Sequence, residues 1–223
     1  MWLSNSSIGR KVVMSVTGIA LVLFLTFHML MNLVALFSAE GYNMVCEFLG
    51  TNWYALIGTL ALAALFVIHI IYAFWLTMLN RAARGNERYA VSVKPKTVEW
   101  ASQNMLVLGI IVILGLALHL FNFWYNMMFA ELIGNPLMGG LSATDGYGYI
   151  EQTFSNPVFF VLYIIWLCAL WFHLTHGFWS SMQTLGWNNT TWINRWKCIS
   201  NIYSTIIILG FMLVAVVFFV KNV

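Results

Sequence analysis

The sequence predicts an all-α integral membrane protein, a five-helix bundle. Of its 223 residues 61% are hydrophobic and only 8% are charged, whereas about a quarter of the residues of a soluble domain are charged. Five apolar stretches reach or exceed the roughly 20 residues that cross a bilayer core. They cover about residues 11–37, 53–79, 100–127, 157–185 and 197–220.

The stretches follow one another without an internal repeat, so we expect a single transmembrane domain over residues 1–223. The first stretch follows Arg10 and Lys11, as a signal peptide would, but it is too long for the apolar region of one. We interpret it as an uncleaved helix. The longest connection, 128–156, is rich in glycine and aromatic residues and is expected at the outer interface.

Basic residues predict the orientation, because Lys and Arg gather in cytoplasmic loops. With a cytoplasmic N-terminus, Lys221 is the only basic residue outside, and the outer segments hold acids. The inner basic residues are Arg10, Lys11, Arg81, Arg84, Arg88, Lys94, Lys96, Arg195 and Lys197, and the outer acids are Glu40, Glu47, Glu131, Asp145 and Glu151. The basic segment 80–99 also offers a surface for a cytoplasmic partner.

Several kinds of site are excluded by their missing motifs. Cys46, Cys168 and Cys198 form no C-x-x-C pair, which argues against a disulfide framework, a thiolate metal site and c-type haem attachment. No G-x-G-x-x-G motif is present for a flavin. The formal charge of +3 gives no reason to expect nucleic acid as a partner.

All five histidines fall inside the predicted spans, where ionisable residues usually have a function. His28 and His119 lie in the outer halves of the first and third helices. His69 and His176 lie nearer the inner ends of the second and fourth helices. The two levels differ by roughly 10–15 Å at 1.5 Å per residue.

Two matched pairs at two depths favour two six-coordinate haems, because each iron takes one imidazole on either side. A zinc site would need three or four ligands at one depth. A proton relay would recruit acids, and Glu99 is the nearest one, at the start of the third span. Histidines that only hydrogen-bond neighbouring helices are the remaining alternative. A macrocycle between helices needs small residues beside it, although small residues also serve ordinary helix packing. The candidate glycines for such a position are Gly18, Gly58, Gly109, Gly115 and Gly177.

Two segments carry a resemblance to a known family: "TGIALVLFLTFHMLMNL" around His28 and "HLTHGFWSSMQTLGWNN" from His173. With five spans and histidines in the first four, the chain resembles the di-haem cytochrome b membrane subunits of succinate dehydrogenases and quinol:fumarate reductases. The resemblance covers nearly the whole chain. It implies two haem b groups, an outer one on His28 and His119 and an inner one on His69 and a histidine of the fourth helix.

The resemblance also implies partners and a location. These are a flavoprotein subunit and an iron–sulfur subunit on the cytoplasmic face, a membrane quinone, usually menaquinone in this branch, and a bacterial cytoplasmic membrane with its lipid. Such a complex belongs to the tricarboxylic acid cycle or to fumarate respiration and can form a dimer of heterotrimers. The chain would carry electrons and anchor the soluble subunits.

Depth and the "HG" of the resemblance both favour His176 over His173 as the inner ligand, with Gly177 beside it. His173 is then expected to hydrogen-bond a propionate, water or carbonyl group. Quinone chemistry needs an acid that exchanges protons, and Glu47 and Glu40 are the candidates.

On the inner side, Arg81 is expected to hold haem propionates, with Arg84 and Ser15 as further candidates, because guanidinium groups pair with carboxylates. Two other functions stay open. One is the b-type anchor of a formate dehydrogenase or nitrate reductase. The other is a haem-free membrane anchor or small transporter.

Overall fold

All regular structure in the computed structural model, which describes residues 5–84 and 99–222, is helical. Five helical segments are long and apolar enough to cross a membrane, as the sequence predicts. They are built on α2 (Ser7–Leu33), α4 (Trp53–Arg84), α5 (Trp100–His119), α8 (Pro157–Thr184) and α9 (Trp192–Asn222). The 3₁₀ turn η1 (Val34–Leu36) extends α2, and η2 (Leu120–Phe129) and α6 (Ala130–Leu132) extend α5.

The helices run further than the apolar stretches at their charged ends. α4 continues to Arg84, and α9 begins at Trp192, before Arg195 and Lys197. Long basic side chains can keep their apolar stems on a helix while their charged ends reach water. The charged residues therefore mark the edge of the apolar region and not the end of the helix.

Several helices begin at a side chain that accepts a hydrogen bond from a free backbone N–H, as N-caps do. Ser6 accepts from Gly9 N at 2.9 Å before α2, and Asn156 accepts from Val158 N at 2.9 Å before α8. Pro157 occupies the first turn of α8, where its missing N–H costs nothing. These residues fix where two of the histidine-bearing helices start.

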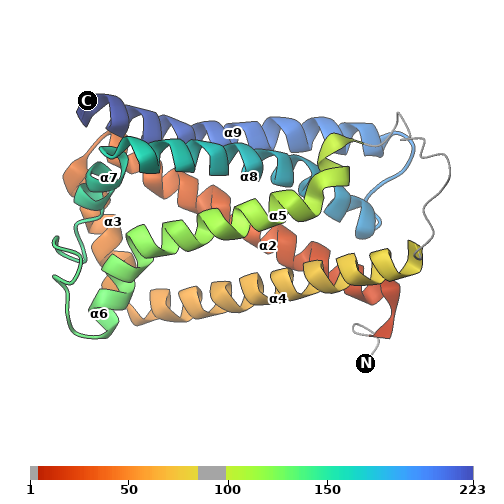
Figure 1. Ribbon diagram of the computed structural model, residues 1–223, viewed down its shortest axis with the longest axis horizontal. Helices are drawn as coiled ribbons and strands as arrows, with labels where there is room; N and C mark the ends of the chain where they lie inside the picture. Colours follow the sequence, from red (N-terminus) through yellow and green to blue (C-terminus); the bar gives the residue numbers. More distant parts are fainter. Residues whose placement is uncertain (1–4, 85–98, 223) are drawn as a thin grey trace.

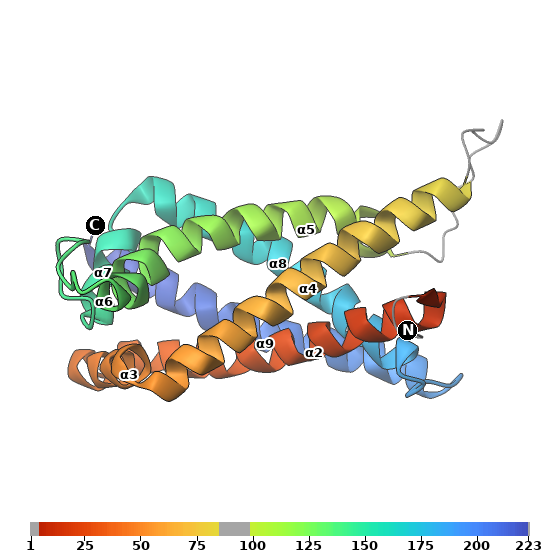
Figure 2. The same ribbon diagram turned by 90° about the horizontal axis from the view of Figure 1, so that it is seen from below.

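The helices pack unevenly. α8 and α9 lie side by side along one edge of the bundle, α2 and α5 cross between them and α4, and α4 lies along the opposite edge (Figure 1). α4 crosses the others diagonally and packs mainly on α2 (Figure 2). The described side chains of α4 are accordingly half-buried or exposed, and His69 is one of the half-buried ones.

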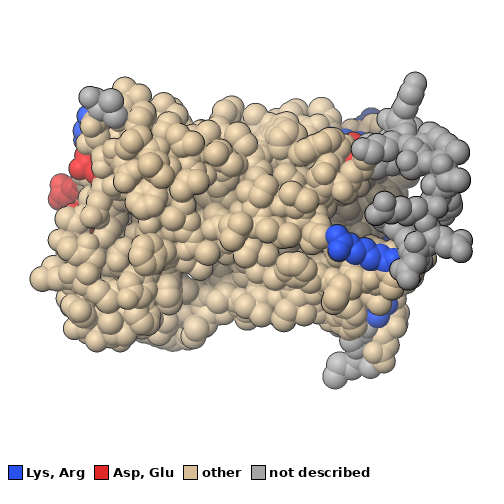
Figure 3. Space-filling view, in the orientation of Figure 1, with Lys and Arg blue, Asp and Glu red and all other residues tan. Residues whose placement is uncertain are grey.

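Charged side chains gather at the two ends of the bundle, and the middle of the face in Figure 3 has none. We call the end with Arg10, Lys11, Arg81, Arg195 and Lys197 the basic end. We call the other the acidic end; it includes α3 (Ala39–Thr51) and α7 (Gly146–Phe154), which lie beside each other (Figure 1). α7 lies in the stretch expected as an interfacial connection, and Tyr149, Ile150 and Phe154 anchor it in the core.

The third span changes its helical type directly after His119. η2 is a π-helix over Leu120–Phe129, a form that is rare and frequently found at functional sites. Its wider turns bring the Asn126 side chain within 3.1 Å of the Phe121 carbonyl oxygen. They also place Asn122 inside the bundle, where it donates to the Tyr163 hydroxyl at 3.3 Å.

Candidate functional site: two facing histidine pairs

His28 of α2 and His119 of α5 face each other near the acidic end. Their ring centroids lie 5.8 Å apart with nearly perpendicular planes. Phe24 stacks on His28 at 5.4 Å, and Trp166 of α8 lies 5.7 Å from His119. We call His28 and His119 the acidic-end pair; it is the pairing that residue depth predicts.

A second pair, His69 of α4 and His173 of α8, lies nearer the basic end. Its ring centroids are 6.5 Å apart. The Thr17 hydroxyl of α2 is 3.1 Å from Nδ1 of His69, and the buried Nδ1 of His173 has no hydrogen-bond partner among the described residues. We call His69 and His173 the basic-end pair.

This arrangement differs from the expected pairing of His69 with His176, because the ring that contacts His69 is that of His173. The apolar stretch predicts an end of the second helix near residue 79, whereas α4 continues to Arg84, so His69 lies fifteen residues from its end. α8 ends at Thr184, which places His173 eleven residues and His176 eight residues from that end. Because α4 is longer than predicted, His69 lies further from the basic end than predicted. His173 is further from that end than His176, and its ring is the one that contacts His69.

His176 joins a polar cluster at the basic end. Its Nδ1 lies 3.8 Å from the carboxylate of Glu99, which also accepts from Trp179 Nε1 at 3.2 Å and pairs with Lys197 Nζ at 2.8 Å. Burial acts to raise the pKa of Glu99, but the hydrogen bonds and charges, chiefly those of Lys197, hold it below its usual range. The cluster ties the start of α5 to α8 and α9.

The two pairs are separated along α2 and along α8, which pass both. On α2, Thr17 contacts His69 and lies eleven residues before His28, about 16 Å along the axis. On α8, Trp166 contacts His119 and lies seven residues before His173, about 10 Å. The pairs therefore form two sites at two depths.

The centroid separation of each pair is close to that of one metal held between two imidazoles. Imidazole nitrogen binds a metal at about 2 Å, so two rings on opposite sides have centroids about 6 Å apart. In residues 5–84 and 99–222, no group of three or more His, Cys, Asp or Glu side chains could hold a metal ion. A metal at either pair would need its other ligands from a prosthetic group such as a porphyrin.

The rings also keep some accessible surface. His28, His69, His119 and His173 are each only half-buried, although all face another helix of the bundle. A Cβ added at Gly177, one turn beyond His173, would meet nothing within 4 Å. Protein atoms do not enclose the rings completely, which suits a flat group lying against the histidines.

The glycines near the pairs have different surroundings. A Cβ at Gly115 would lie 2.0 Å from the Trp166 ring, so only glycine admits that ring beside His119. A Cβ at Gly18 would meet His69 Cε1 at 3.4 Å, and one at Gly109 would meet His173 Cε1 at 3.9 Å, both ordinary contacts. A Cβ at Gly58 meets nothing within 4 Å. Of the expected glycines, Gly115 is the one whose missing side chain the packing requires.

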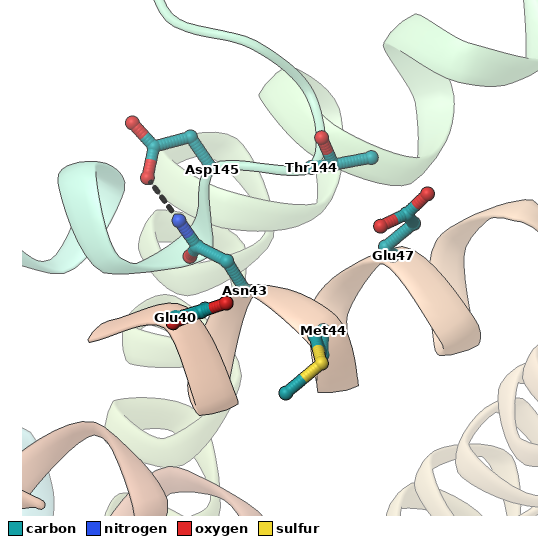
Figure 4. A pocket seen from close by; sticks show the side chains of 6 residues that line it. All are labelled: Glu40, Asn43, Met44, Glu47, Thr144 and Asp145. Carbon is teal, nitrogen blue, oxygen red and sulfur yellow. Dashed lines mark hydrogen bonds between the residues drawn. The ribbon is translucent and has the colours of Figure 1, made fainter. Parts of the chain in front are cut away.

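Glu40 and Glu47 share a cleft of about 280 Å³ at the acidic end (Figure 4). Both come from α3, and Asp145 approaches from the segment before α7 and accepts from Asn43 Nδ2 at 2.8 Å. An apolar groove of about 390 Å³ lies on the other flank of α3, with Met44 lining both spaces. Phe27 and Met31, on the helix that carries His28, line the groove.

The basic residues expected to hold propionates are not gathered at a pair. Arg81 is exposed in the last turn of α4, twelve residues beyond His69, about 18 Å along the axis. Ser15 is buried on α2, two residues before Thr17. The side chain of Arg84, and Arg88, Lys94 and Lys96 of the basic segment, lie outside the described residues.

Three contacts of the histidines do not follow from the sequence. They are those of Thr17 with His69, of Trp166 with His119 and of Glu99 with His176. Thr17 begins the "TGIALVLFLTFHMLMNL" segment, and a hydroxyl residue inside an apolar span was the signal available in the sequence. The structure shows that this residue is buried. Trp166 could have been suspected from the aromatic content of the fourth span. The contact of Glu99 with α8 depends on helix packing that residue counting does not give.

Comparisons with protein-family models, curated proteins and solved structures gave no match. The assignment of a function therefore depends on the geometry of the histidine pairs and on the sequence resemblance.

Proposed function

We propose that this chain is the membrane cytochrome b subunit of a succinate:quinone oxidoreductase and that it holds two b haems. The observation that supports this most is the meeting of histidines from four different helices as two facing pairs. A haem held by two imidazoles has no open coordination position and serves electron transfer, not oxygen chemistry.

The four histidines divide the binding between two sites. His28 and His119 would hold the outer haem, and His69 and His173 would hold the inner haem. The choice of His173 over His176 follows from the ring that faces His69. His176 stays at the edge of the inner site with Glu99, where it shapes the polar surroundings.

The cleft at the acidic end supports a quinone site. A quinone takes up protons as it is reduced, so a site needs a group that exchanges protons close to an apolar surface. Glu40 and Glu47 supply carboxylates on one flank of α3, and the apolar groove with Phe27 and Met31 lies on the other. Menaquinone is the proposed quinone, following the branch of the family that the chain resembles.

The charged ends support the orientation and the partners. We place the basic end in the cytoplasm, because the described Lys and Arg residues other than Lys221 lie there. A flavoprotein and an iron–sulfur subunit dock on this end and supply the dicarboxylate chemistry. The host membrane is a bacterial cytoplasmic membrane, and the complex forms a dimer of heterotrimers.

Purification tests the proposal. The chain is expressed with its genomic neighbours and with haem supplied, and the reduced-minus-oxidised spectrum and the haem content are measured. We expect a b-type spectrum, two haems per chain, and co-purification of a flavoprotein and an iron–sulfur protein. A haem-free chain contradicts the proposal, and haem with other partners favours a formate dehydrogenase or nitrate reductase anchor.

A further inference from the structure

Thr17 makes the one hydrogen bond between helices that reaches a ring nitrogen of either pair among the described residues. Its side chain is 5% exposed, and Oγ1 lies 3.1 Å from Nδ1 of His69 on α4. The neighbouring Gly18 also lies against the ring, and a Cβ there would be in ordinary contact with His69 Cε1 at 3.4 Å. The hydroxyl of Thr17 is therefore the polar contact that holds His69 against α2.

The hydroxyl proton of Thr17 is already used within its own helix. Oγ1 lies 2.9 Å from the carbonyl oxygen of Val13 and 3.1 Å from that of Met14, and it donates in this direction. A hydroxyl has one proton and two lone pairs. Toward His69, Oγ1 is therefore the acceptor, and Nδ1 of His69 must carry the proton.

A neutral imidazole with its proton on Nδ1 has its lone pair on Nε2. We propose that Thr17 is a positioning residue that fixes this tautomer, so that the lone pair on Nε2 of His69 would be free to bind the iron of the inner haem. An acceptor on the far nitrogen raises the basicity of a metal-bound imidazole. Hydrogen bonding to an axial ligand is one of the ways in which a protein sets the potential of haem. Thr17 therefore lowers the midpoint potential of the inner haem, an inference that rests on the proposed function.

The other rings lack this arrangement. Asn32 Nδ2, a donor, lies 3.5 Å from both ring nitrogens of His28, so it cannot accept a ring proton. Nδ1 of His173 has no hydrogen-bond partner in the described part of the chain. The effect of Thr17 is consequently expected at one haem and not at the other.

Two substitutions separate the hydrogen bond from packing. Thr17→Val keeps the shape and removes the hydroxyl, and Thr17→Ser keeps the hydroxyl and removes the methyl group. Both haems are titrated potentiometrically in the purified complex. We expect Thr17→Val to shift the inner haem to higher potential and leave the outer haem unchanged, with Thr17→Ser close to wild type. Equal potentials in Thr17→Val and wild type, or equal shifts or haem loss in both variants, overturn the inference.

A second readout does not depend on haem. In protein labelled with ¹⁵N-histidine, NMR reports which nitrogen of His69 carries the proton. A Nδ1–H tautomer in wild type and Thr17→Ser that becomes mixed in Thr17→Val supports the role of Thr17. A mixed or Nε2–H tautomer in haem-free wild type overturns it. A chain that never binds haem contradicts the proposed function, whereas the tautomer still decides the role of Thr17.

Discussion

The imidazole of His173 faces that of His69 across the bundle at a centroid distance of 6.5 Å, while His176, one turn away, lies beside Glu99. Residues three apart on a helix point about 60° from each other. In this packing the His173 ring is the one that faces His69.

We therefore predict different effects for the two α8 histidines. His173→Ala is expected to remove the inner haem and lower the haem content from two to one per chain. His176→Ala is expected to keep both haems, because it removes a ring from the Glu99 cluster and not from the pair. Haem quantification on both variants checks this. Loss of haem in His176→Ala alone would show that α8 is rotated by about 60° when haem is bound.

The close packing of Trp166 on Gly115 predicts a steric effect at the outer site. Gly115→Ala puts a Cβ 2.0 Å from the indole, so Trp166 must leave its place beside His119. Overpacking of this kind typically costs about 1–3 kcal/mol. We expect a lower melting temperature and a perturbed outer-haem spectrum.

Gly58→Ala is the matched control for Gly115→Ala, because a Cβ there meets nothing within 4 Å. It should leave both haem spectra unchanged and should not lower the melting temperature, since alanine is the better helix former. An outer-haem spectrum in Gly115→Ala that is identical to wild type would contradict the close packing of this ring.

The Glu99 cluster predicts a loss of stability in acid. Burial acts to raise the pKa of Glu99 in the folded protein, but Lys197 and Trp179 stabilise the carboxylate more and hold the pKa below its usual value. The stabilisation is present above the unfolded-state pKa, about 4.3, and is lost as pH falls through the lower folded-state value. Since the Glu99 side chain is 39% exposed, the contribution is about 1 kcal/mol or less.

Thermal unfolding of wild type and Glu99→Gln in detergent, followed from pH 7 down to pH 3, measures this contribution. Wild type should be the more stable near neutral pH, and the difference should shrink as Glu99 becomes protonated. A difference that is constant over this range would show that Glu99 does not act through its charge.

The cleft at the acidic end predicts a catalytic effect without a haem effect. Glu47→Gln and Glu40→Gln remove a proton-exchanging group, which typically contributes about 10²–10⁴-fold to rate. We expect at least one of them to slow quinone reduction by the complex strongly while both haems keep their spectra. Glu131→Gln, an acid of the same end that does not line the cleft, should leave the rate unchanged. Equal rates in all three variants would place the quinone elsewhere.

Much of the fold follows from the sequence, because span length and the absence of charge suffice to identify membrane helices. The five spans and the facing of His28 and His119 agree with expectation. The ring that contacts His69 is His173 and not the expected His176, since the level of His69 depends on α4 continuing five residues past its apolar stretch to Arg84. An error of one turn in the predicted end of a helix is enough to change which of His173 and His176 is expected to lie level with His69.

Other features depend on tertiary packing that a linear pattern does not contain. The π-helix after His119 appears only through its backbone hydrogen bonds. The acceptor role of Thr17 requires α2 and α4 to be in contact at one register. α3 and α7 are short and amphipathic, and neither reaches the length by which the spans can be recognised.

The central claim is that each histidine pair holds one haem. Haem b per chain, measured in wild type and in variants of one histidine from each pair, tests it most directly. We predict two haems in wild type, one in His119→Ala with the inner spectrum retained, and one in His69→Ala with the outer spectrum retained. A haem-free wild type, or two haems remaining in both variants, would contradict the claim.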